Sequence, residues 1–339
     1  MTDTSNIKVA VVIPCYRVLQ QIEDVVRAIP PEVDQIFCVD DCCPDKSGAF
    51  IEKTITDTRV TILYHERNQG VGGATITGYE AALEQGADVV VKLDGDGQMD
   101  PREINALIGP ILDGDADYAK GNRFFRPEDL IGMPRLRLFG NAVLSFFTKF
   151  STGYWSSFDP TNGYTAIHRH ALANISLDKV SRDYFFESDM LFRLRTIGAV
   201  IADVPLMARY GDEKSNLKIT KVVFPFLAKH TINLGKRIIY NYYIRDFNIA
   251  SIQLPLAIIF LCFGIIFGFK SWLHGADTGI PATAGTVMIA ALPIFAGIQL
   301  LLGFLSFDMR NTPTLPLQKL IRGRTMPRSS VNRSNDRHS

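Results

Sequence analysis

The chain has 339 residues, of which 47% are apolar, so it is long enough for one large domain with extra elements or for two domains with substantial cores. The formal net charge is +1, but residues 1–120 carry a net −11 and residues 121–339 a net +12, which suggests that one part faces anions and the other holds cations. No dense block of Lys and Arg with interleaved aromatic residues occurs, which argues against a nucleic-acid-binding protein.

The cysteines favour a reducing environment. There are five, an odd number, and no two form a CxxC pair, which argues against a disulfide framework or a zinc site. The N-terminal segment MTDTSNIKVAVVIP has no basic region before a long apolar run, so we expect no signal peptide. We therefore expect this part of the chain in the cytosol.

Five segments have the composition of strands that are apolar on both faces. They cover residues 8–13, 35–40, 60–65, 88–94 and 199–205. Helix-like segments lie between the first four, and this alternation is typical of an α/β fold. We therefore expect a mostly parallel sheet with helices on both faces.

Polar or aromatic side chains follow three of these strands directly. Because ligands bind at the carboxyl ends of strands in open parallel sheets, these side chains would form one acidic crevice with aromatic walls. They belong to Pro14-Cys15-Tyr16, Asp40-Asp41 and Asp94-Gly95-Asp96.

The third of these strand ends has the spacing of a metal site. A chain that turns at Gly95 can direct the carboxylates of Asp94 and Asp96 at one ion, and Gln98 can add a neutral oxygen. Oxygen ligands suit Mg²⁺ or Mn²⁺, which keep open positions for phosphate oxygens. The segment therefore predicts a divalent cation that attracts a diphosphate.

A further acid in the same segment, Asp100, has a structural explanation. It suits the N-cap of the next helix, with Pro101 in the first turn and Glu103 completing a capping box. We therefore leave Asp100 out of the metal site.

The glycine-rich segment 68–78, NQGVGGATITG, follows a strand and opens a helix. It lacks the third glycine of a dinucleotide-binding fingerprint, because Thr75 occupies that position, and it has no Walker A lysine. Two explanations remain open. The glycines either let a ligand approach the backbone closely or pack the helix tightly on the sheet.

Two uncharged stretches near the C-terminus reach the length of membrane spans. The first covers residues 249–269 and the second residues 279–307, and a bilayer crossing needs about 20 residues. A buried helical hairpin in a soluble core is the alternative. Basic residues flank both stretches, which places the flanks and the large N-terminal part in the cytoplasm. They are Lys236, Arg237, Arg245, Arg310, Lys319, Arg322 and Arg324.

Residues 221–247 mix Phe, Ile and Tyr with Lys and Arg. This composition suits helices at a membrane interface, and an amphipathic helix packed on the domain is equally consistent with it. We expect a catalytic domain over 1–215, juxtamembrane helices over 216–248, two transmembrane helices over 249–308 and a basic cytosolic tail over 309–339.

Seven segments occur in the order seen in one enzyme family. They are VVIPCY, VDDCCPD, NQGVGGA, LDGDGQMDP, GNR at 121–123, DPTNGY at 159–164 and FESDMLFR at 186–193. Over roughly residues 8–215 the chain resembles the polyprenyl-phosphate (dolichol-phosphate-type) sugar transferases of glycosyltransferase family 2. The resemblance implies a GT-A fold and transfer of a sugar from a UDP- or GDP-linked donor to a polyprenyl or dolichyl phosphate. It also implies a multi-pass protein, most simply of a bacterial inner membrane, and it is compatible with a homo-oligomer.

The resemblance also implies roles for individual residues. Donor contacts fall on Pro14, Tyr16, Asp40, Asp41, Asn68, Gly70 and Asp94. The metal and the diphosphate fall on Asp94, Asp96 and Gln98. The acceptor phosphate falls on Arg123 and Arg135, with Lys214 as a further candidate in a segment that otherwise reads as a basic linker. Glu187 and Asp189 fall where the family faces the sugar, or they are simply an acidic pair at a helix N-terminus.

One departure from the family concerns the donor. The family usually has Asn-Glu after the tyrosine, whereas this chain has Arg17-Val18. This difference leaves open which nucleobase the donor carries.

The implied reaction needs no general base, because a lipid monophosphate with a second pKa of about 6 is already an anionic nucleophile. We therefore expect Asp94, Asp96 and Arg123 to act by positioning the reactants and balancing their charge. The resemblance implies inversion of the anomeric centre in a single displacement.

Two other functions remain to be weighed. A processive polysaccharide synthase would share the metal loop and the spans, but it carries a Q-x-x-R-W segment, and neither Trp155 nor Trp272 follows an arginine. A non-catalytic membrane subunit that binds nucleotide sugars would not need the pair of Asp94 and Asp96 together with Arg123.

Overall fold

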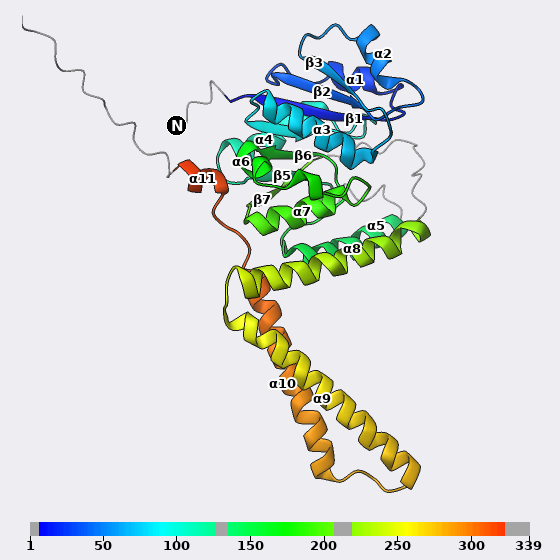
Figure 1. Cartoon of the computed structure of the whole chain (residues 1–339), viewed down its shortest axis with the longest axis vertical. Helices are drawn as coiled ribbons and strands as arrows, with labels where there is room; N and C mark the ends of the chain where they lie inside the picture. Colours follow the sequence, from blue (N-terminus) through cyan, green and yellow to red (C-terminus); the bar gives the residue numbers. More distant parts are fainter. Residues whose placement is uncertain (1–6, 126–134, 207–218, 323–339) are drawn as a thin grey trace, which may run out of the picture.

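The structure, a computed structural model, describes residues 7–125, 135–206 and 219–322. One seven-stranded sheet forms the centre of the described residues up to Leu206, which the sequence predicts to be catalytic and which are here called the catalytic part (Figure 1). Its strands are β1 (Val9–Cys15), β2 (Gln35–Asp40), β3 (Val60–Tyr64), β4 (Val89–Lys92), β5 (Tyr118–Asn122), β6 (Thr165–His168) and β7 (Ile201–Pro205). They lie in the order β3-β2-β1-β4-β6-β5-β7. Only β6 runs antiparallel to its neighbours in this sheet, so the predicted mostly parallel sheet is confirmed.

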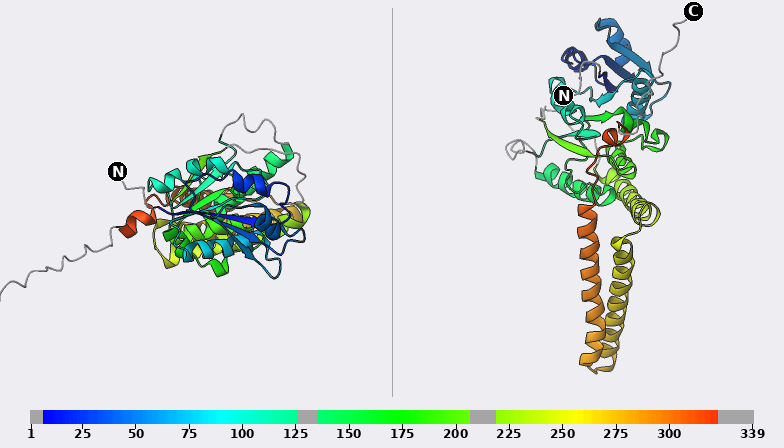
Figure 2. Two further views of the ribbon diagram at one scale, coloured as in Figure 1. Left: turned by 90° about the horizontal axis from the view of Figure 1, so that it is seen from above. Right: turned by 90° about the vertical axis from the view of Figure 1, so that its left-hand side faces the viewer.

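Helices cover both faces of the sheet, as the doubly apolar strands require (Figure 2). Val9, Val11 and Ile13 of β1 pack against residues of α1, α2 and α4, whereas Ala10 and Val12 pack against residues of α3, α6 and α7. The elements are α1 (Ile22–Arg27), α2 (Ser47–Thr54), α3 (Gly70–Glu84), the 3-10 turn η1 (Pro101–Glu103), α4 (Ile104–Leu112), α6 (Arg169–Ala173), the 3-10 turn η3 (Leu177–Lys179) and α7 (Phe186–Ile197).

Two strands in this sheet were not expected from the sequence, namely β5 and β6. Their sequences, YAKGN and TAIH, are short and lack the apolar run that marked the other five strands. They matter for the site because β6 lies antiparallel between β4 and β5, so the carboxyl ends of β4 and β5 lie at the same edge of the sheet.

The helix start at Asp100 is confirmed. The Asp100 side chain accepts a hydrogen bond from the backbone N–H of Arg102 at 3.1 Å, and Pro101 opens η1 before α4 begins.

Two long helices, α5 (Arg135–Thr152) and α8 (Ile219–Ile239), lie side by side between the sheet and the C-terminal hairpin (Figure 1). The inner side of α8 buries His230, Asn233 and Arg237, whereas Ile232 and Ile239 are more than half exposed. One face of α8 therefore packs on the catalytic part while apolar side chains remain exposed on another. A π-helical segment, η4 (Tyr240–Ile244), follows it.

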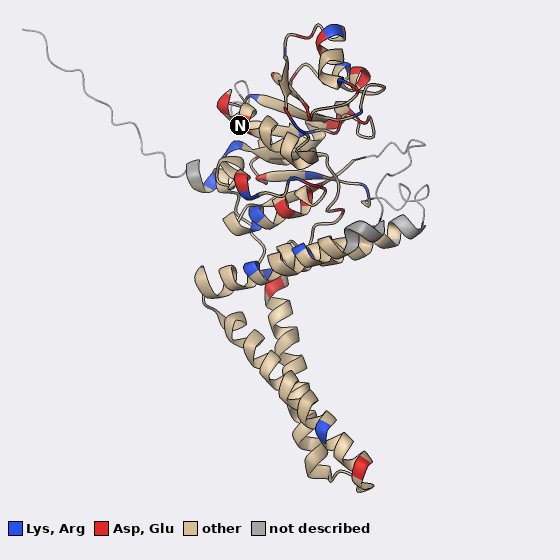
Figure 3. Ribbon diagram, turned by 45° about the vertical axis from the view of Figure 1, so that its right-hand side comes forward, with Lys and Arg blue, Asp and Glu red and all other residues tan. Residues whose placement is uncertain are grey.

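The hairpin consists of α9 (Ile249–Thr278) and α10 (Ala284–Arg310), both long and apolar enough to cross a membrane. Most of their surface is exposed, unlike that of core helices in a soluble protein, and charged residues are concentrated on the catalytic part and at the ends of the hairpin (Figure 3). Small residues bring the helices together. A Cβ on Gly264 would lie 2.6 Å from Ile294, and one on Gly297 would lie 2.8 Å from Leu261.

Two expected boundaries differ in the structure. Residues 270–278, which separate the two uncharged stretches in the sequence, continue α9, and the loop between the helices covers residues 279–283. Residues 317–322, expected within a basic tail, form α11 (Leu317–Arg322), which returns to the catalytic part. There the Asp117 carboxylate accepts hydrogen bonds from the backbone N–H groups of Leu317 at 2.9 Å and Gln318 at 3.2 Å.

A buried ion pair joins the hairpin to the catalytic part. Asp308, near the end of α10, is 1% exposed and pairs with Arg237 of α8 at 2.6 Å. The indole N–H of Trp155 donates to the same carboxylate at 2.8 Å, and the Tyr242 hydroxyl also donates to it. Three segments far apart in the sequence therefore meet on one carboxylate.

Replacing Asp308 with Asn should destabilise the protein strongly. Arg237 would remain buried without its counter-ion, which costs about 3–5 kcal/mol. Thermal unfolding of the purified protein in detergent measures the loss. Asp277→Asn is the control, because Asp277 is exposed in the same hairpin and its loss should change stability by less than about 0.5 kcal/mol. Equal melting temperatures for both variants would contradict the proposed importance of this junction.

Candidate active site

The acidic end of β4 is built around a buried lysine. Lys92, the last residue of β4, is fully buried, and its ammonium lies 2.6 Å from Asp94 Oδ1 and 3.3 Å from Glu187 Oε1. It also donates to the backbone carbonyl of Gly163 at 3.4 Å. Glu187 lies in the first turn of α7, so β4, α7 and the segment before β6 converge on one ammonium.

The electrostatics of this cluster keep the lysine charged. Burial alone would lower the pKa of Lys92, but the carboxylates of Asp94 and Glu187 outweigh it and raise that pKa above its ordinary value. Burial raises the pKa of Glu187, and Lys92 opposes the shift. The Asp94 side chain is 28% exposed, so one side of this carboxylate faces solvent while Oδ1 contacts the ammonium.

Gly163 has no room for a side chain. An added Cβ would overlap Asp94 Oδ2 and lie 2.6 Å from Lys92 Nζ. Gly163 therefore lets the segment before β6 lie directly against the Asp94 carboxylate.

The donor set at this strand end suits a hard divalent cation. Asp94 and Asp96 supply carboxylate oxygens, both side chains are partly exposed, and the Gln98 backbone N–H donates to Asp96 Oδ1 at 3.0 Å. In the part of the chain that the structure describes, no three His, Cys, Asp or Glu side chains are gathered as a metal-binding group. Mg²⁺ is ordinarily held by one or two carboxylates together with substrate phosphates and water, so these two acids are chemically sufficient.

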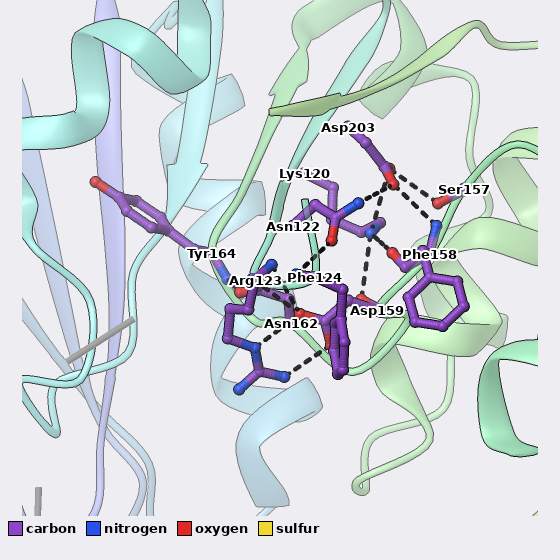
Figure 4. A network of polar contacts seen from close by, with 10 residues as sticks. All are labelled: Lys120, Asn122, Arg123, Phe124, Ser157, Phe158, Asp159, Asn162, Tyr164 and Asp203. Atoms are coloured by element: carbon purple, nitrogen blue, oxygen red, sulfur yellow. Dashed lines mark hydrogen bonds and ion pairs between the residues drawn. The ribbon is translucent and has the colours of Figure 1, made fainter. Parts of the chain in front are cut away.

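Arg123 lies at the end of β5, on the same edge of the sheet. Its guanidinium makes two bonds of 2.7 Å to Asp159, which is fully buried (Figure 4). Asp159 has φ +56°, a left-handed conformation that is uncommon for residues other than glycine. The Arg123 side chain is 15% exposed, so the pair lies just beneath the surface.

A polar network holds the segment that carries Asp159. Asp203 of β7 accepts from the Phe158 backbone N–H at 2.8 Å and from the Asn122 amide at 3.0 Å, and it pairs with Lys120 at 3.3 Å (Figure 4). Lys120, which is 1% exposed, also donates to the carbonyl oxygens of Phe158 and Asp159. Residues 157–164, here called the bridging segment, thus run from this network to Gly163 beside Asp94.

The predicted donor residues at the ends of β1 and β2 differ in accessibility. Tyr16 is 44% exposed, with the Arg17 guanidinium 5.5 Å from its ring centroid, and Pro14 is partly exposed. Asp40 is buried, and its oxygens accept from the backbone N–H groups of Cys43 at 2.7 Å and Gly48 at 2.6 Å. Asp40 therefore shapes the following loop, and its contact with a nucleoside stays a prediction.

Asp41 has a similar structural role. It accepts from the backbone N–H groups of Gln69 at 2.7 Å and Gly70 at 2.8 Å, where α3 begins, and it contacts His65 Nδ1 at 2.7 Å. The Asn68 amide donates to the Asp41 carbonyl at 3.3 Å. These bonds place Asp41, Asn68 and Gly70 in one turn.

The glycines of this turn approach protein backbone. A Cβ on Gly70 would lie 2.5 Å from the Arg182 carbonyl oxygen, and one on Gly72 would lie 2.6 Å from that of Ser181. Close packing against residues 181–182 thus accounts for these two glycines.

The two acidic residues of α7, Glu187 and Asp189, have different partners in the structure. Glu187 joins the Lys92 cluster, whereas Asp189 is buried and accepts from the Ser181 backbone N–H at 3.0 Å, from Arg193 at 3.1 Å and from Asn233 at 3.1 Å. Asp189 therefore ties α7 to α8. Arg135 begins α5, but its side chain lies outside the described residues, and so does the whole of Lys214.

Comparison with known proteins identifies the family. The family model described as "Glycosyl transferase family 2" matches residues 10–176. The UDP-N-acetylglucosamine–dolichyl-phosphate N-acetylglucosaminyltransferase of Methanococcus voltae is 31% identical over 229 residues, which cover 63% of this chain and 90% of that protein. The chain belongs to glycosyl transferase family 2. The resemblance inferred from the motifs is therefore confirmed, and the protein is a glycosyltransferase.

Further comparisons agree with this assignment. The undecaprenyl-phosphate mannosyltransferase of Micrococcus luteus is 30% identical over 204 residues, covering 59% of this chain and 82% of that protein. Among solved structures, the glucosyl-3-phosphoglycerate synthase of Mycobacterium tuberculosis in complex with UDP matches with a TM-score of 0.51 and 18% identity, covering 69% of this chain and 80% of that chain. This likeness supports the predicted GT-A fold of the family 2 domain.

Sequence reasoning missed two buried groups that organise this family 2 site, Lys92 and Asp159. The sequence could have revealed Lys92, because it is a charged residue between Leu93 and a run of valines in a strand that is otherwise apolar. Asp159 lay in the DPTNGY motif, but its partner Arg123 is 36 residues away in the sequence. Nothing in the local sequence pairs the two.

Replacing Gly163 with Ala should lower transferase activity by about 10²-fold, because the added methyl would displace Asp94 or Lys92. Initial rates and thermal unfolding, measured together, separate a local effect from misfolding. Gly109→Ala in α4 is the control, because no atom lies within 4 Å of the added Cβ. We expect that control to keep wild-type rates, and a fully active Gly163→Ala enzyme would refute the arrangement.

Proposed function

We propose that this protein catalyses a metal-dependent, inverting transfer of a sugar from a UDP- or GDP-linked donor to a polyprenyl or dolichyl phosphate at the cytoplasmic face of a membrane. The observation that carries the proposal is the bridging segment. It contacts Arg123 through Asp159 and contacts Asp94 through Gly163. Asp159 and Gly163 are four residues apart in the sequence. Four residues span at most about 14 Å, so a diphosphate at Asp94 and a phosphate near Arg123 would be close neighbours.

The acceptor class is supported by the relatives and by the hairpin. The Methanococcus voltae relative is named for dolichyl phosphate and the Micrococcus luteus relative for undecaprenyl phosphate. Such acceptors are held in a bilayer, and α9 and α10 have the length and apolar composition of membrane spans. A soluble acceptor would give the enzyme no use for them.

The proposed orientation in the membrane is supported by the two ends of the hairpin. The Asp308–Arg237 pair and the contacts of α11 with Asp117 hold the C-terminal end of α10 next to the catalytic part. At the start of α9, the Tyr243 hydroxyl donates to the Ser251 carbonyl at 3.0 Å, which holds the other end of the hairpin close to η4. Basic residues flank both spans, which supports a cytoplasmic catalytic part by the positive-inside rule, and a bacterial inner membrane is the simplest site.

The chemistry requires the chain to hold two anions in contact. An oxygen of the acceptor phosphate forms a bond to the anomeric carbon, while the bond from that carbon to the donor diphosphate breaks and the nucleoside diphosphate leaves with the electron pair. The acceptor is already ionised at neutral pH, so no side chain has to remove a proton. One displacement from the face opposite the leaving group inverts the anomeric centre.

Individual side chains supply the positioning. Arg123 presents a planar fork that suits phosphate oxygens, and Asp159 fixes its orientation before the acceptor arrives. Asp94 and Asp96 would hold Mg²⁺ or Mn²⁺, with Gln98 beside them, and the ion would supply positive charge to the departing diphosphate. The solved glucosyl-3-phosphoglycerate synthase with Mn²⁺ and UDP-glucose is a precedent on the same fold.

The test of the function is a transfer assay with purified full-length protein. Radiolabelled UDP- and GDP-sugars are incubated with polyprenyl phosphate and Mn²⁺, and labelled product is extracted into organic solvent. A single lipid-linked sugar is expected, whereas a long polymer would favour a processive synthase. Donor binding without transfer would favour a non-catalytic subunit. Thermal shift identifies the donor beforehand, because a ligand of the native state raises the melting temperature.

Asp96→Asn should reduce transfer by at least about 10²-fold while the protein stays folded, because the amide keeps an acceptor for the Gln98 N–H but loses the charge that a dication needs. Initial rates over a Mn²⁺ series measure the effect. Wild-type enzyme should also lose activity in EDTA and recover it on adding Mn²⁺. Undiminished turnover in EDTA would overturn the role of the metal.

Arg123→Lys should raise the KM for polyprenyl phosphate about tenfold and leave the KM for the donor unchanged, because lysine keeps the charge but loses the fork. Steady-state kinetics in both substrates measure the split. The matched control is Arg169→Lys, whose Asp88 partner precedes β4 at the opposite edge of the sheet. A rise in the KM for the donor, with an unchanged KM for polyprenyl phosphate, would contradict the assignment of Arg123 to the acceptor.

A further inference from the structure

The proposed transfer assigns no role to Lys92, yet the position of this residue is unusual. Its side chain is 0% exposed, and its neighbours Val90, Val91 and Leu93 are fully buried apolar residues. A lysine is almost never fully buried unless it is paired, because burial removes the water that stabilises its charge. An apolar residue would fill this end of the strand without that cost.

The contacts of Lys92 fix the carboxylate that follows it. The ammonium lies 2.6 Å from Asp94 Oδ1, which holds that oxygen on the protein side. Asp94 Oδ2 lies against Gly163, where there is no space for a Cβ. The carboxylate thus lies between an ammonium and a backbone, and its exposed side is the direction from which a cation would approach.

The charges of the cluster also count. Asp94, Asp96 and Glu187 carry three formal negative charges and Lys92 one positive charge, a total of −2 that one divalent cation would balance. Without the lysine the total would be −3. Because the ammonium and a cation would both be attracted to Asp94, the lysine opposes binding of the cation.

We infer that Lys92 competes with the divalent cation for the carboxylate of Asp94, so that the site binds the ion only moderately before the donor arrives. The inference rests on the proposed function, in which Asp94 and Asp96 hold the ion. Donor phosphates add the negative charge that tips the balance toward binding. Departure of the nucleoside diphosphate removes that charge again, which favours release of the ion with it.

The experiment titrates Mn²⁺ into nucleotide-free, full-length protein in detergent and follows the signal of free Mn²⁺ by electron paramagnetic resonance. Lys92→Met removes the charge at similar length, and it should tighten Mn²⁺ binding about tenfold relative to wild type. Lys92→Arg keeps the charge and should bind Mn²⁺ with wild-type affinity. A purely structural lysine would show the reverse, with Met loosening the site as Asp94 loses its orientation.

The matched control is Arg169→Met. Arg169 is 42% exposed and pairs with Asp88 at 3.2 Å at the opposite edge of the sheet, so its loss removes one positive charge at a distance from Asp94. We expect unchanged Mn²⁺ affinity. Tighter binding in this control as well would assign the effect to general charge and overturn the inference.

A double variant covers the case in which Lys92→Met fails to fold. Lys92→Met with Glu187→Gln removes both charges of one pair and keeps the total at −2, so it leaves no buried carboxylate without its partner. It should still bind Mn²⁺ several-fold more tightly than wild type, because the ammonium beside Asp94 is gone. Equal or weaker binding in the folded variant would refute the role of Lys92.

The two proposals fail differently. If Mn²⁺ binds neither wild type nor any variant, and Asp96→Asn changes nothing, the metal site itself is wrong. If wild type binds Mn²⁺ and Asp96→Asn abolishes binding, while removal of the Lys92 charge does not tighten it, only the inference about Lys92 is wrong.

Discussion

The ammonium of Lys92 sits inside a sheet that is buried on both faces, and the arrangement of the site follows from the need to balance it. Water cannot reach this group, so carboxylates must balance its charge. Asp94 comes from the end of the same strand and Glu187 from the first turn of α7. One buried charge therefore brings together the end of β4, the first turn of α7 and the bridging segment.

The same principle recurs at two other points of the structure. Asp159 is fully buried and is paired with Arg123, and Asp308 is almost fully buried and is paired with Arg237. In a low-dielectric interior, an ion pair with good geometry is costly to break from either side, so each pair fixes the relative position of two segments. The first pair positions the bridging segment at the sheet edge, and the second attaches the hairpin beneath α5 and α8.

Much of the fold could be predicted from the sequence because five strands are apolar on both faces and the spans are long and uncharged. The strands β5 and β6 could not, since YAKGN and TAIH are short and partly polar, and their pairing with β4 and β7 is a tertiary contact. Asp94 and Asp96 were predicted as ligands because they follow an apolar strand, and Arg123 was predicted from the GNR motif of the family; their roles in the reaction stay predictions. Asp40 and Asp41 looked like ligand contacts, and in the structure they accept hydrogen bonds from backbone amides.

By itself, the sequence determined the class of fold, the family and the presence of two apolar helices, because these depend on periodicity, composition and motif order along the chain. Only the tertiary structure decided which charges meet. Lys92 and Glu187 are 95 positions apart, and Arg237 and Asp308 are 71 apart. Pairing over such distances is set by the way the sheet and helices pack, because an unpaired charge in an apolar interior is too costly to leave without a partner.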